Sequence, residues 1–219
     1  MSNALKSEEI LSVALSKGRL QDATLELLGR AGVEVDATGA GSRKLIFQDR
    51  SGCFQFFMLK PVDVPTYVEY GVADLGVAGW DVLLESEADV HQPLDLGIGR
   101  CVMAVAGPRS TARKNYRELS AVRIATKYPR ITTDHFTRQG VPVEIITLSG
   151  SVELAPRLGL SERIVDLVAT GRTLADNGLE VIEPICDVSA RLIVNRAGYQ
   201  VKRRAVSRFI QRLADSLNR

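Results

Sequence analysis

Residues 163–174 read RIVDLVATGRTL, an apolar and β-branched run that passes directly into a turn of small residues. The run predicts a buried strand that contains one acid, Asp166, and the turn predicts a short helix that starts near Thr173. Such a turn leaves several backbone N–H groups unpaired beside the positive end of a helix dipole, which suits an anion. Because the dipole alone contributes only about 0.3–1 kcal/mol, the N–H groups and the hydroxyls of Thr170 and Thr173 must supply most of the binding.

Asp166 comes just before this turn, where a carboxylate can accept hydrogen bonds from sugar hydroxyls. Groups that donate hydrogen bonds to a phosphate, beside a carboxylate that accepts hydrogen bonds from two sugar hydroxyls, indicate a site for a ribose 5-phosphate. An ordinary strand-to-helix turn has the same pattern, so this stretch alone leaves both interpretations open.

On either side of this stretch, short apolar runs alternate with helical patterns, which is typical of parallel sheets covered by helices. Strands are expected at 11–15, 54–59, 73–78, 101–106, 122–126, 143–148, 164–168, 181–185 and 190–195, and an amphipathic helix at 201–217. A polar, basic stretch at 109–117 separates two groups of strands. The pattern predicts an α/β protein with two lobes, the first formed by 1–106 and 188–219 and the second by 107–187. Since ligands of such folds bind beyond the carboxyl ends of strands, we expect the site in the cleft between the lobes.

The composition of the chain argues against a nucleic-acid-binding, zinc-binding or membrane-spanning protein. A chain of 219 residues with 45% hydrophobic residues has enough apolar side chains for a substantial core. The net charge of +2 does not favour a nucleic-acid binder. Cys53, Cys101 and Cys186 fit no zinc motif and are interpreted as reduced core residues. No run approaches the roughly 20 apolar residues of a membrane span and no signal peptide is evident, so a cytoplasmic protein is expected.

A second glycine-containing turn, SKGR at 16–19, follows the first expected strand. Gly18 allows the backbone to approach a ligand closely, while Lys17 and Arg19 supply positive charge. Arg43 follows a segment rich in Gly and Ser and is either another cation of the site or part of a solvated hairpin.

The segment SGSVE at 149–153 forms a third turn, after the expected strand 143–148. Its acid, Glu153, is either a ligand-binding carboxylate or a helix cap. The two histidines, His91 and His135, lie in separate contexts without the partners of a nucleophilic triad or a zinc site. Cations, hydroxyls and carboxylates therefore carry the expected chemistry, which suits group transfer between phosphorylated molecules.

Six stretches together resemble the short-form ATP phosphoribosyltransferases, the enzymes that open histidine biosynthesis. They are ALSKGRL at 14–20, DVPTYVE at 63–69, ADLGV at 73–77, LDLGIG at 94–99, SGSVELAP at 149–156 and DLVATGRTL at 166–174. Each stretch is modestly specific, but the six occur in the family's order across nearly the whole chain.

The resemblance implies the two-lobed fold of type II periplasmic binding proteins. It also implies a reaction between N1 of the ATP adenine and C1 of phosphoribosyl pyrophosphate, with pyrophosphate released and Mg²⁺ present. The metal is expected to be carried by the substrate, without direct protein ligands. Adenine N1 attacks as a neutral lone pair, so the reaction needs no general base. The charges that develop on pyrophosphate and on an oxocarbenium-like ribose call for cations and carboxylates.

Site roles follow from the same resemblance. The 5-phosphate is expected to be held by Ala169, Thr170, Gly171, Arg172 and Thr173. Asp166 is expected to bind the ribose hydroxyls, with Glu153 near the ribose or its metal. Arg19 and Arg43 are expected to contact the triphosphate or the leaving group, with Lys17 close by.

The chain departs from the family at two positions. Lys60 stands where arginine is frequent, and because lysine lacks the bidentate geometry of arginine it is left out of the expected site. Trp80 stands where a smaller or charged residue is usual, and it is interpreted as a core or interface aromatic rather than a purine-stacking residue.

The resemblance also implies partners. The length fits a catalytic subunit that forms a homodimer and binds a regulatory subunit resembling histidyl-tRNA synthetase, with no nucleic acid or membrane involved. Two other functions remain open. One is a solute-binding module of the same fold. The other is a salvage phosphoribosyltransferase that uses a free base, although such enzymes usually have two adjacent acids and Leu167 follows Asp166 here.

Overall fold

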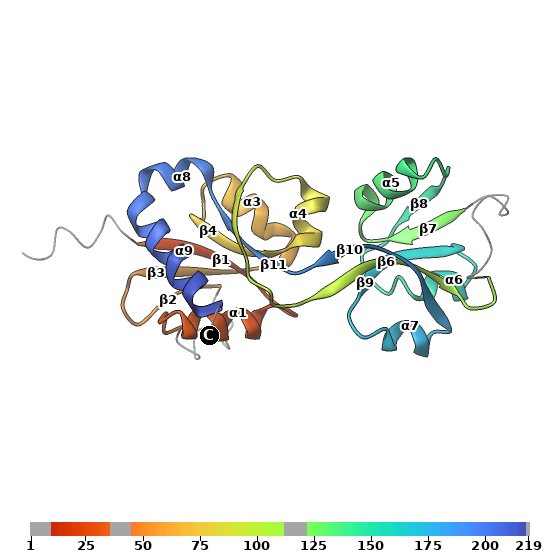
Figure 1. Ribbon diagram of the computed structural model, residues 1–219, viewed down its shortest axis with the longest axis horizontal. Helices are drawn as coiled ribbons and strands as arrows, with labels where there is room; N and C mark the ends of the chain where they lie inside the picture. Colours follow the sequence, from red (N-terminus) through yellow and green to blue (C-terminus); the bar gives the residue numbers. More distant parts are fainter. Residues whose placement is uncertain (1–9, 36–44, 112–121, 218–219) are drawn as a thin grey trace, which may run out of the picture. The chain divides into compact units, whose positions relative to one another are not determined.

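The computed structural model describes residues 10–35, 45–111 and 122–217, which divide into two compact units (Figure 1). The first unit comprises Met1–Gly99 and Ser189–Arg219, and the second comprises Arg100–Val188. Among these described residues, no helix is long and apolar enough to cross a membrane. The expectation of two α/β lobes is therefore met by two separate α/β units.

In its described part, the first unit contains a six-stranded sheet of order β2-β3-β1-β4-β11-β5. Its strands are β1 (Leu11–Ser16), β2 (Ile46–Gln48), β3 (Phe54–Leu59), β4 (Leu75–Gly79), β5 (His91–Asp95) and β11 (Ala190–Val194). β1 pairs in parallel with β3 and β4, whereas β2 and β11 are antiparallel to their neighbours. Parallel strands with both faces covered are mostly apolar and buried, and in β1 every residue except Ser12 is buried.

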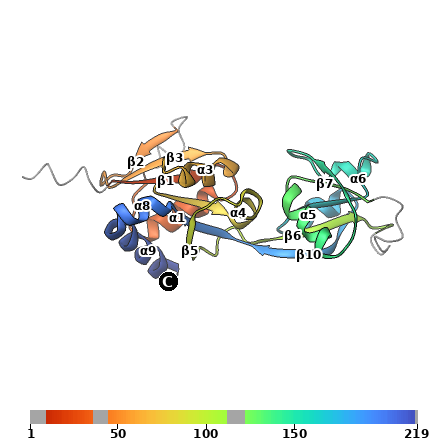
Figure 2. The ribbon, with the colours of Figure 1, turned by 90° about the horizontal axis from the view of Figure 1, so that it is seen from above.

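Helices cover both faces of this sheet (Figure 1; Figure 2). They are α1 (Gln21–Arg30), the 3-10 turn η1 (Pro61–Asp63), α3 (Val64–Glu69), α4 (Trp80–Ser86), α8 (Arg196–Val201) and α9 (Arg203–Leu217). On one face α1 and α9 pack with Leu15 of β1 and Phe56 of β3, and Phe209 of α9 lies 5.1 Å from the ring of Phe54. On the other face α3 and α4 pack against Ala14 and Ile193.

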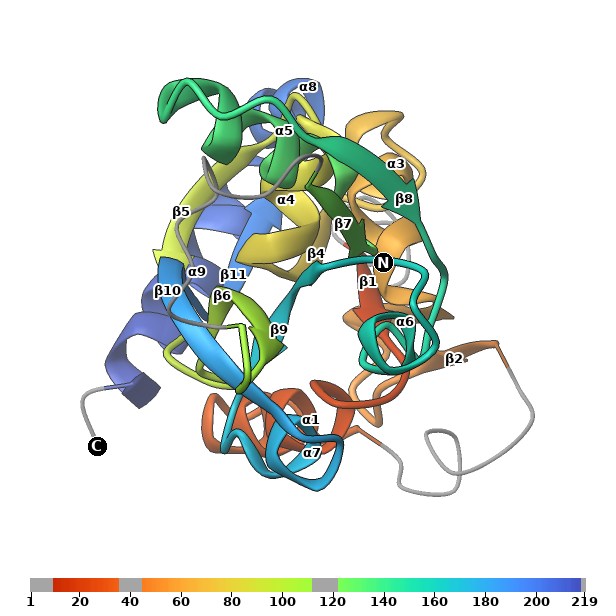
Figure 3. The same cartoon turned by 90° about the vertical axis from the view of Figure 1, so that its right-hand side faces the viewer.

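The second unit, as far as it is described, contains a five-stranded sheet of order β10-β6-β9-β7-β8. Its strands are β6 (Cys101–Pro108), β7 (Arg123–Thr126), β8 (Glu144–Thr147), β9 (Arg163–Val168) and β10 (Leu179–Val188). β7 is parallel to β8 and β9, and β6 is antiparallel to β9 and β10. The helices are α5 (Pro129–Arg138), α6 (Leu154–Arg157) and α7 (Arg172–Asp176). Figure 3 shows α5 and α7 on opposite sides of this sheet.

Three expectations differ from the structure. The strand at 101–106 was placed in the first lobe, but β6 pairs with β9 and β10 of the second unit. The sheets are mixed rather than parallel, because β6 is antiparallel to β9 and β10, and β11 is antiparallel to β4. Cys101 is buried and Cys186 half-buried, but Cys53 is exposed in the turn before β3, so the core interpretation is wrong for Cys53.

Candidate active site

The second sheet aligns the carboxyl ends of three parallel strands. β9, β7 and β8 are consecutive neighbours, so their following loops, 169–171, 127–128 and 148–153, leave the sheet at one edge. We call this the second carboxyl edge. Ligands of α/β proteins bind at such edges because loops and helix starts converge there. Two of these three loops contain residues that the sequence assigns to the site.

Asp166 lies in β9, half-buried, with Leu167 N–H donating to its Oδ1 at 2.8 Å. Side chains alternate between the two faces of a strand, so Asp166 shares a face with Ile164 and Val168. Both of these residues pack in a cluster that includes Leu174 of α7. Asp166 therefore projects on the face that α7 covers, directly before the turn.

The turn at 169–173 has the predicted strand-to-helix form, with α7 starting at Arg172. Gly171 has φ +73°, a left-handed conformation that glycine adopts without strain, and it precedes the first helical residue. Ala169, Thr170 and Thr173 are exposed, and Arg172 N–H points to Thr170 Oγ1 at a long 3.4 Å. The turn thus presents exposed hydroxyls beside first-turn N–H groups that have no intrahelical acceptor.

Glu153 immediately precedes α6 and makes no capping hydrogen bond through its side chain. Its neighbours Val152 and Ala155 are buried in the same cluster as Leu174. Glu153 is therefore anchored on the face that also carries Asp166 and the 169–173 turn. The helix-cap interpretation lacks its hydrogen bond, which leaves the carboxylate half-buried at the second carboxyl edge.

The first sheet forms a comparable edge, the first carboxyl edge, where β1, β3 and β4 end. The turn after β1 contains Gly18 with φ +90°, flanked by exposed Lys17 and Arg19. Arg19 Nη1 donates to the carbonyl oxygen of Gly99 at 2.8 Å. Lys17 N–H donates to Leu59 O at 2.9 Å, which fixes the turn against the end of β3. Arg43 lies outside the described residues.

Sequence reasoning left out two exposed lysines that the topology brings to these edges. The register pairs Ser16 with Leu59, so Lys60 follows β3 beside Lys17. Lys127 follows β7 at the centre of the second carboxyl edge. The sequence offers one indication of both lysines, namely that each directly follows an apolar run expected to form a strand.

Trp80, the other departure, starts α4 after β4 and is half-buried against the core cluster that contains Ala78 and Leu83. The guanidinium of Arg191 lies 5.2 Å from the centre of its indole, and Arg191 Nη1 is 3.2 Å from Asp95 Oδ2. These contacts agree with a packing role for the indole, one face of which carries the Arg191 guanidinium.

Paired charges lie at the opposite edge of the second sheet. Arg123 Nη2 donates to Glu162 Oε1 at 2.7 Å, and this hydrogen bond lowers the pKa of Glu162. Arg163, only 1% exposed, donates from Nη1 to Thr111 Oγ1 at 2.8 Å. These contacts fix the amino ends of β7 and β9, away from the carboxyl edge.

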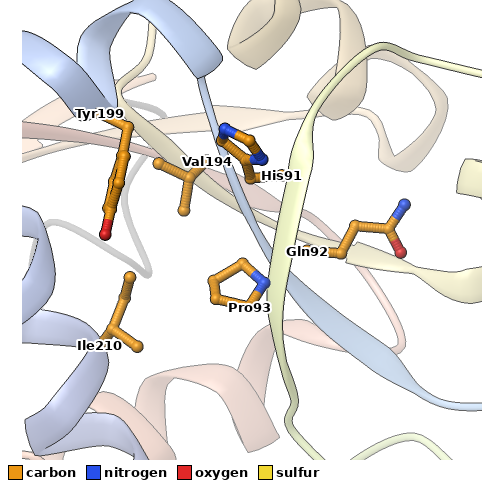
Figure 4. Close-up of a pocket in the computed structure, with 6 residues that line it drawn as sticks. All are labelled: His91, Gln92, Pro93, Val194, Tyr199 and Ile210. Atoms are coloured by element: carbon orange, nitrogen blue, oxygen red, sulfur yellow. The ribbon is translucent and has the colours of Figure 1, made fainter.

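Among the cavities lined by described residues of the first unit are two of about 300 Å³. Figure 4 shows one of them, with the rings of Tyr199, His91 and Pro93 around it. The other is lined by the end of α1 with the two residues after it and by α9, among them Arg30 and Arg212. Neither lining contains a residue assigned to the site.

Known proteins identify the family. A model of the HisG family, described as ATP phosphoribosyltransferase, matches residues 60–215. An ATP phosphoribosyltransferase of Geobacter metallireducens is 48% identical over 206 residues, covering 94% of this chain and 97% of that protein. One from Sorangium cellulosum is 49% identical over 203 residues, covering 93% of this chain and 94% of that protein.

Solved structures agree with this result. The ATP phosphoribosyl transferase (HisG:HisZ) complex from Thermotoga maritima contains a chain that is 37% identical, with a TM-score of 0.81 and coverage of 95% of this chain and 98% of that one. The periplasmic aliphatic sulphonate binding protein SsuA from Escherichia coli is 11% identical with a TM-score of 0.63, covering 96% and 73%, and shows the fold alone. The resemblance and the periplasmic-binding-protein-like fold are thus confirmed, and the chain belongs to the ATP phosphoribosyltransferase family.

Proposed function

We propose that this protein joins N1 of the ATP adenine to C1 of phosphoribosyl pyrophosphate, giving phosphoribosyl-ATP and pyrophosphate in the first step of histidine biosynthesis. The observation that carries the proposal is the β9–α7 connection, in which Asp166 precedes an exposed turn with left-handed Gly171. Membership of the ATP phosphoribosyltransferase family indicates that the substrate bound at this turn is phosphoribosyl pyrophosphate.

In this proposal the turn binds the 5-phosphate through its N–H groups and through the hydroxyls of Thr170 and Thr173, with Arg172 adding charge. Asp166 accepts hydrogen bonds from the ribose hydroxyls and so orients C1. Its negative charge also favours the positive charge that develops on the ribose as the bond to pyrophosphate breaks. Glu153, on the same face, adds a second carboxylate.

Cations have the complementary role. We assign Arg19, Arg43 and Lys17 to the triphosphate of ATP or to the departing pyrophosphate. The hydrogen bond from Arg19 to Gly99 O, which holds this guanidinium at the first carboxyl edge, supports the assignment. Because adenine N1 needs no deprotonation, catalysis depends on orientation and charge rather than on a general base.

The residues at the second carboxyl edge fit a metal carried by the substrate. Mg²⁺ keeps several of its waters and binds readily to substrate phosphates, so in this proposal it arrives bound to the pyrophosphate of the donor and needs no direct protein ligand. The residues that the structure describes contain no group of three or more His, Cys, Asp or Glu able to hold a metal. When bound, Mg²⁺ neutralises negative charge on the pyrophosphate.

We also propose that the protein forms a homodimer and assembles with a regulatory subunit resembling histidyl-tRNA synthetase. The hetero-oligomer is supported by the Thermotoga maritima relative, whose solved structure is a HisG:HisZ complex. The homodimer follows only from the family resemblance. A cytoplasmic location is proposed because the reaction consumes ATP.

The test is an assay of phosphoribosyl-ATP formation from ATP and phosphoribosyl pyrophosphate with Mg²⁺, with and without the regulatory subunit. Product that depends on both substrates supports the proposal. Pyrophosphate release with a free base but not with ATP would instead indicate a salvage enzyme. Tight binding of an unphosphorylated solute without pyrophosphate release would indicate a solute-binding module.

A further inference from the structure

Lys127 stands at the centre of the second carboxyl edge. In the register of the sheet, Thr126 of β7 pairs with Val165 of β9 on one side and with Thr147 of β8 on the other. The next residue, Lys127, therefore lies alongside Asp166, across a strand spacing of about 4.8 Å. Although Lys127 and Asp166 are 39 positions apart in sequence, each directly follows a member of the Thr126–Val165 pair.

The backbone on both sides of Lys127 is held by buried threonine hydroxyls. Thr126 Oγ1 donates to Val165 O at 2.8 Å and accepts from Tyr128 N–H at 2.9 Å. Thr132 Oγ1 donates to Tyr128 O at 2.6 Å. Thr126 and Thr132 are both 0% exposed, so these bonds are shielded from water. The loop therefore presents Lys127 from a fixed position, which is what a binding group requires.

The side chain of Lys127 is exposed and makes no hydrogen bond or ion pair with any residue in 10–35, 45–111 and 122–217. Other cations of the second unit do have partners, such as Arg123 with Glu162, Arg157 with Asn177 and Arg163 with Thr111. An exposed lysine is ordinary on a solvated face. Here, however, it stands next to Asp166 on a braced loop, where its charge acts on the bound substrate.

We infer that Lys127 binds the pyrophosphate group of the donor through its ammonium group and stabilises that group as it leaves. The inference rests on the proposed function. Ala169, where the 5-phosphate turn begins, lies three residues beyond Asp166, about 10 Å along the chain. Lys127 is therefore level with the ribose rather than with the 5-phosphate. Pyrophosphate is bonded to the ribose at C1, and a lysine ammonium is a suitable point charge for it.

The experiment compares Lys127→Met, Lys127→Arg and the control Arg138→Met by isothermal titration of the full chain. Arg138 is exposed at the far end of α5, about 13 Å along the helix, so its loss changes the net charge equally. The two probes are magnesium pyrophosphate and ribose 5-phosphate. We expect Lys127→Met to weaken pyrophosphate binding about ten- to hundredfold, the range for a hydrogen bond to a charged group. Ribose 5-phosphate binding should stay within about twofold, and Lys127→Arg should retain most pyrophosphate affinity.

Three results would overturn the inference: unchanged pyrophosphate affinity in Lys127→Met, an equal loss in Arg138→Met, or a loss confined to ribose 5-phosphate. Because the lysine is exposed, the variants should melt as the wild type does. The proposed function is judged separately, by whether the wild-type protein forms phosphoribosyl-ATP. Wild-type product with unaltered pyrophosphate binding in Lys127→Met refutes only the role of Lys127.

Discussion

Replacement of Asp166 by asparagine tests the ribose site with the least structural disturbance. Asparagine has nearly the same size as aspartate and retains an oxygen that can accept the Leu167 N–H, which Asp166 Oδ1 binds at 2.8 Å. The change is thus confined mainly to the charge. Asp166 is half-buried at the end of β9, so its loss of charge is only partly screened by water.

The magnitude follows from the hydrogen bonds that the carboxylate is expected to make. A hydrogen bond to a charged group contributes about 1.5–3 kcal/mol and a neutral one about 0.5–1.5 kcal/mol. In Asp166→Asn, two hydrogen bonds from ribose hydroxyls change from a charged to a neutral acceptor, and the binding free energy therefore falls by about 2–3 kcal/mol. This corresponds to a decrease of roughly 30- to 150-fold in kcat/KM for phosphoribosyl pyrophosphate.

Steady-state kinetics with phosphoribosyl pyrophosphate as the varied substrate measure this loss. The matched control is Asp176→Asn on α7, where the side chain is 70% exposed and lies 3.9 Å from Arg172. The control should have wild-type kinetics, and both variants should melt as the wild type does. A kcat/KM within threefold of the wild type for Asp166→Asn would refute the role of Asp166 in binding the ribose.

Three further predictions concern the turns and the pH dependence of stability. In Gly171→Ala the new Cβ has room, since its nearest neighbour would be Val168 at 3.9 Å, but alanine is strained at φ +73°. This backbone strain of about 1–2 kcal/mol should weaken the binding of ribose 5-phosphate roughly tenfold, as measured by titration calorimetry. Arg19→Glu should lower turnover more than about tenfold, and unaltered kinetics would exclude Arg19 from the site. The pKa of Glu162 lies below its ordinary 4.5 because Arg123 donates to it, so the pair stabilises the fold above that pH. At pH 7 the free energy of unfolding, measured with urea, should be about 0.5–1 kcal/mol higher for the wild type than for Glu162→Gln. This difference should vanish as the pH falls below 4.5 and Glu162 becomes protonated at its lowered pKa. A difference that persists at pH 3 would contradict the prediction.

Strands that are apolar and buried were predictable from the sequence, and strands that are short or polar were not. The strand at 54–59 has the expected bounds because FQFFML alternates between buried and half-buried positions. β5, HQPLD, is mostly exposed and contains proline, so it has no strand pattern. β2 has only three residues. Both are edge strands that gain their order from the neighbour with which they pair.

The direction of each strand also could not be predicted from the sequence. Hydrophobic periodicity reports which faces are buried, but it does not report which way a strand runs. β6 is as apolar as a parallel strand and nevertheless runs antiparallel to β9. The same limit applies to the site. The turn at 169–173 was predictable because all its groups are local, whereas Lys127 joins Asp166 only through the order β9-β7-β8.

The two carboxyl edges differ in charge, and this difference fits the two charges that the reaction must stabilise. Lys17 and Lys60 each follow a member of the last register pair, Ser16 and Leu59, at the first edge, and like charges on adjacent strands destabilise a sheet by a few tenths of a kcal/mol or more. Local conflicts of this kind are expected where a protein binds an anion, because the ligand removes the repulsion. The second edge instead combines the carboxylates of Asp166 and Glu153 with an anion-binding turn. A cationic edge suits a triphosphate, and carboxylates beside a phosphate turn suit a ribose 5-phosphate whose ring becomes positive. Lys60 therefore belongs among the candidate residues even without the bidentate geometry of arginine, since a point charge is sufficient to offset a phosphate.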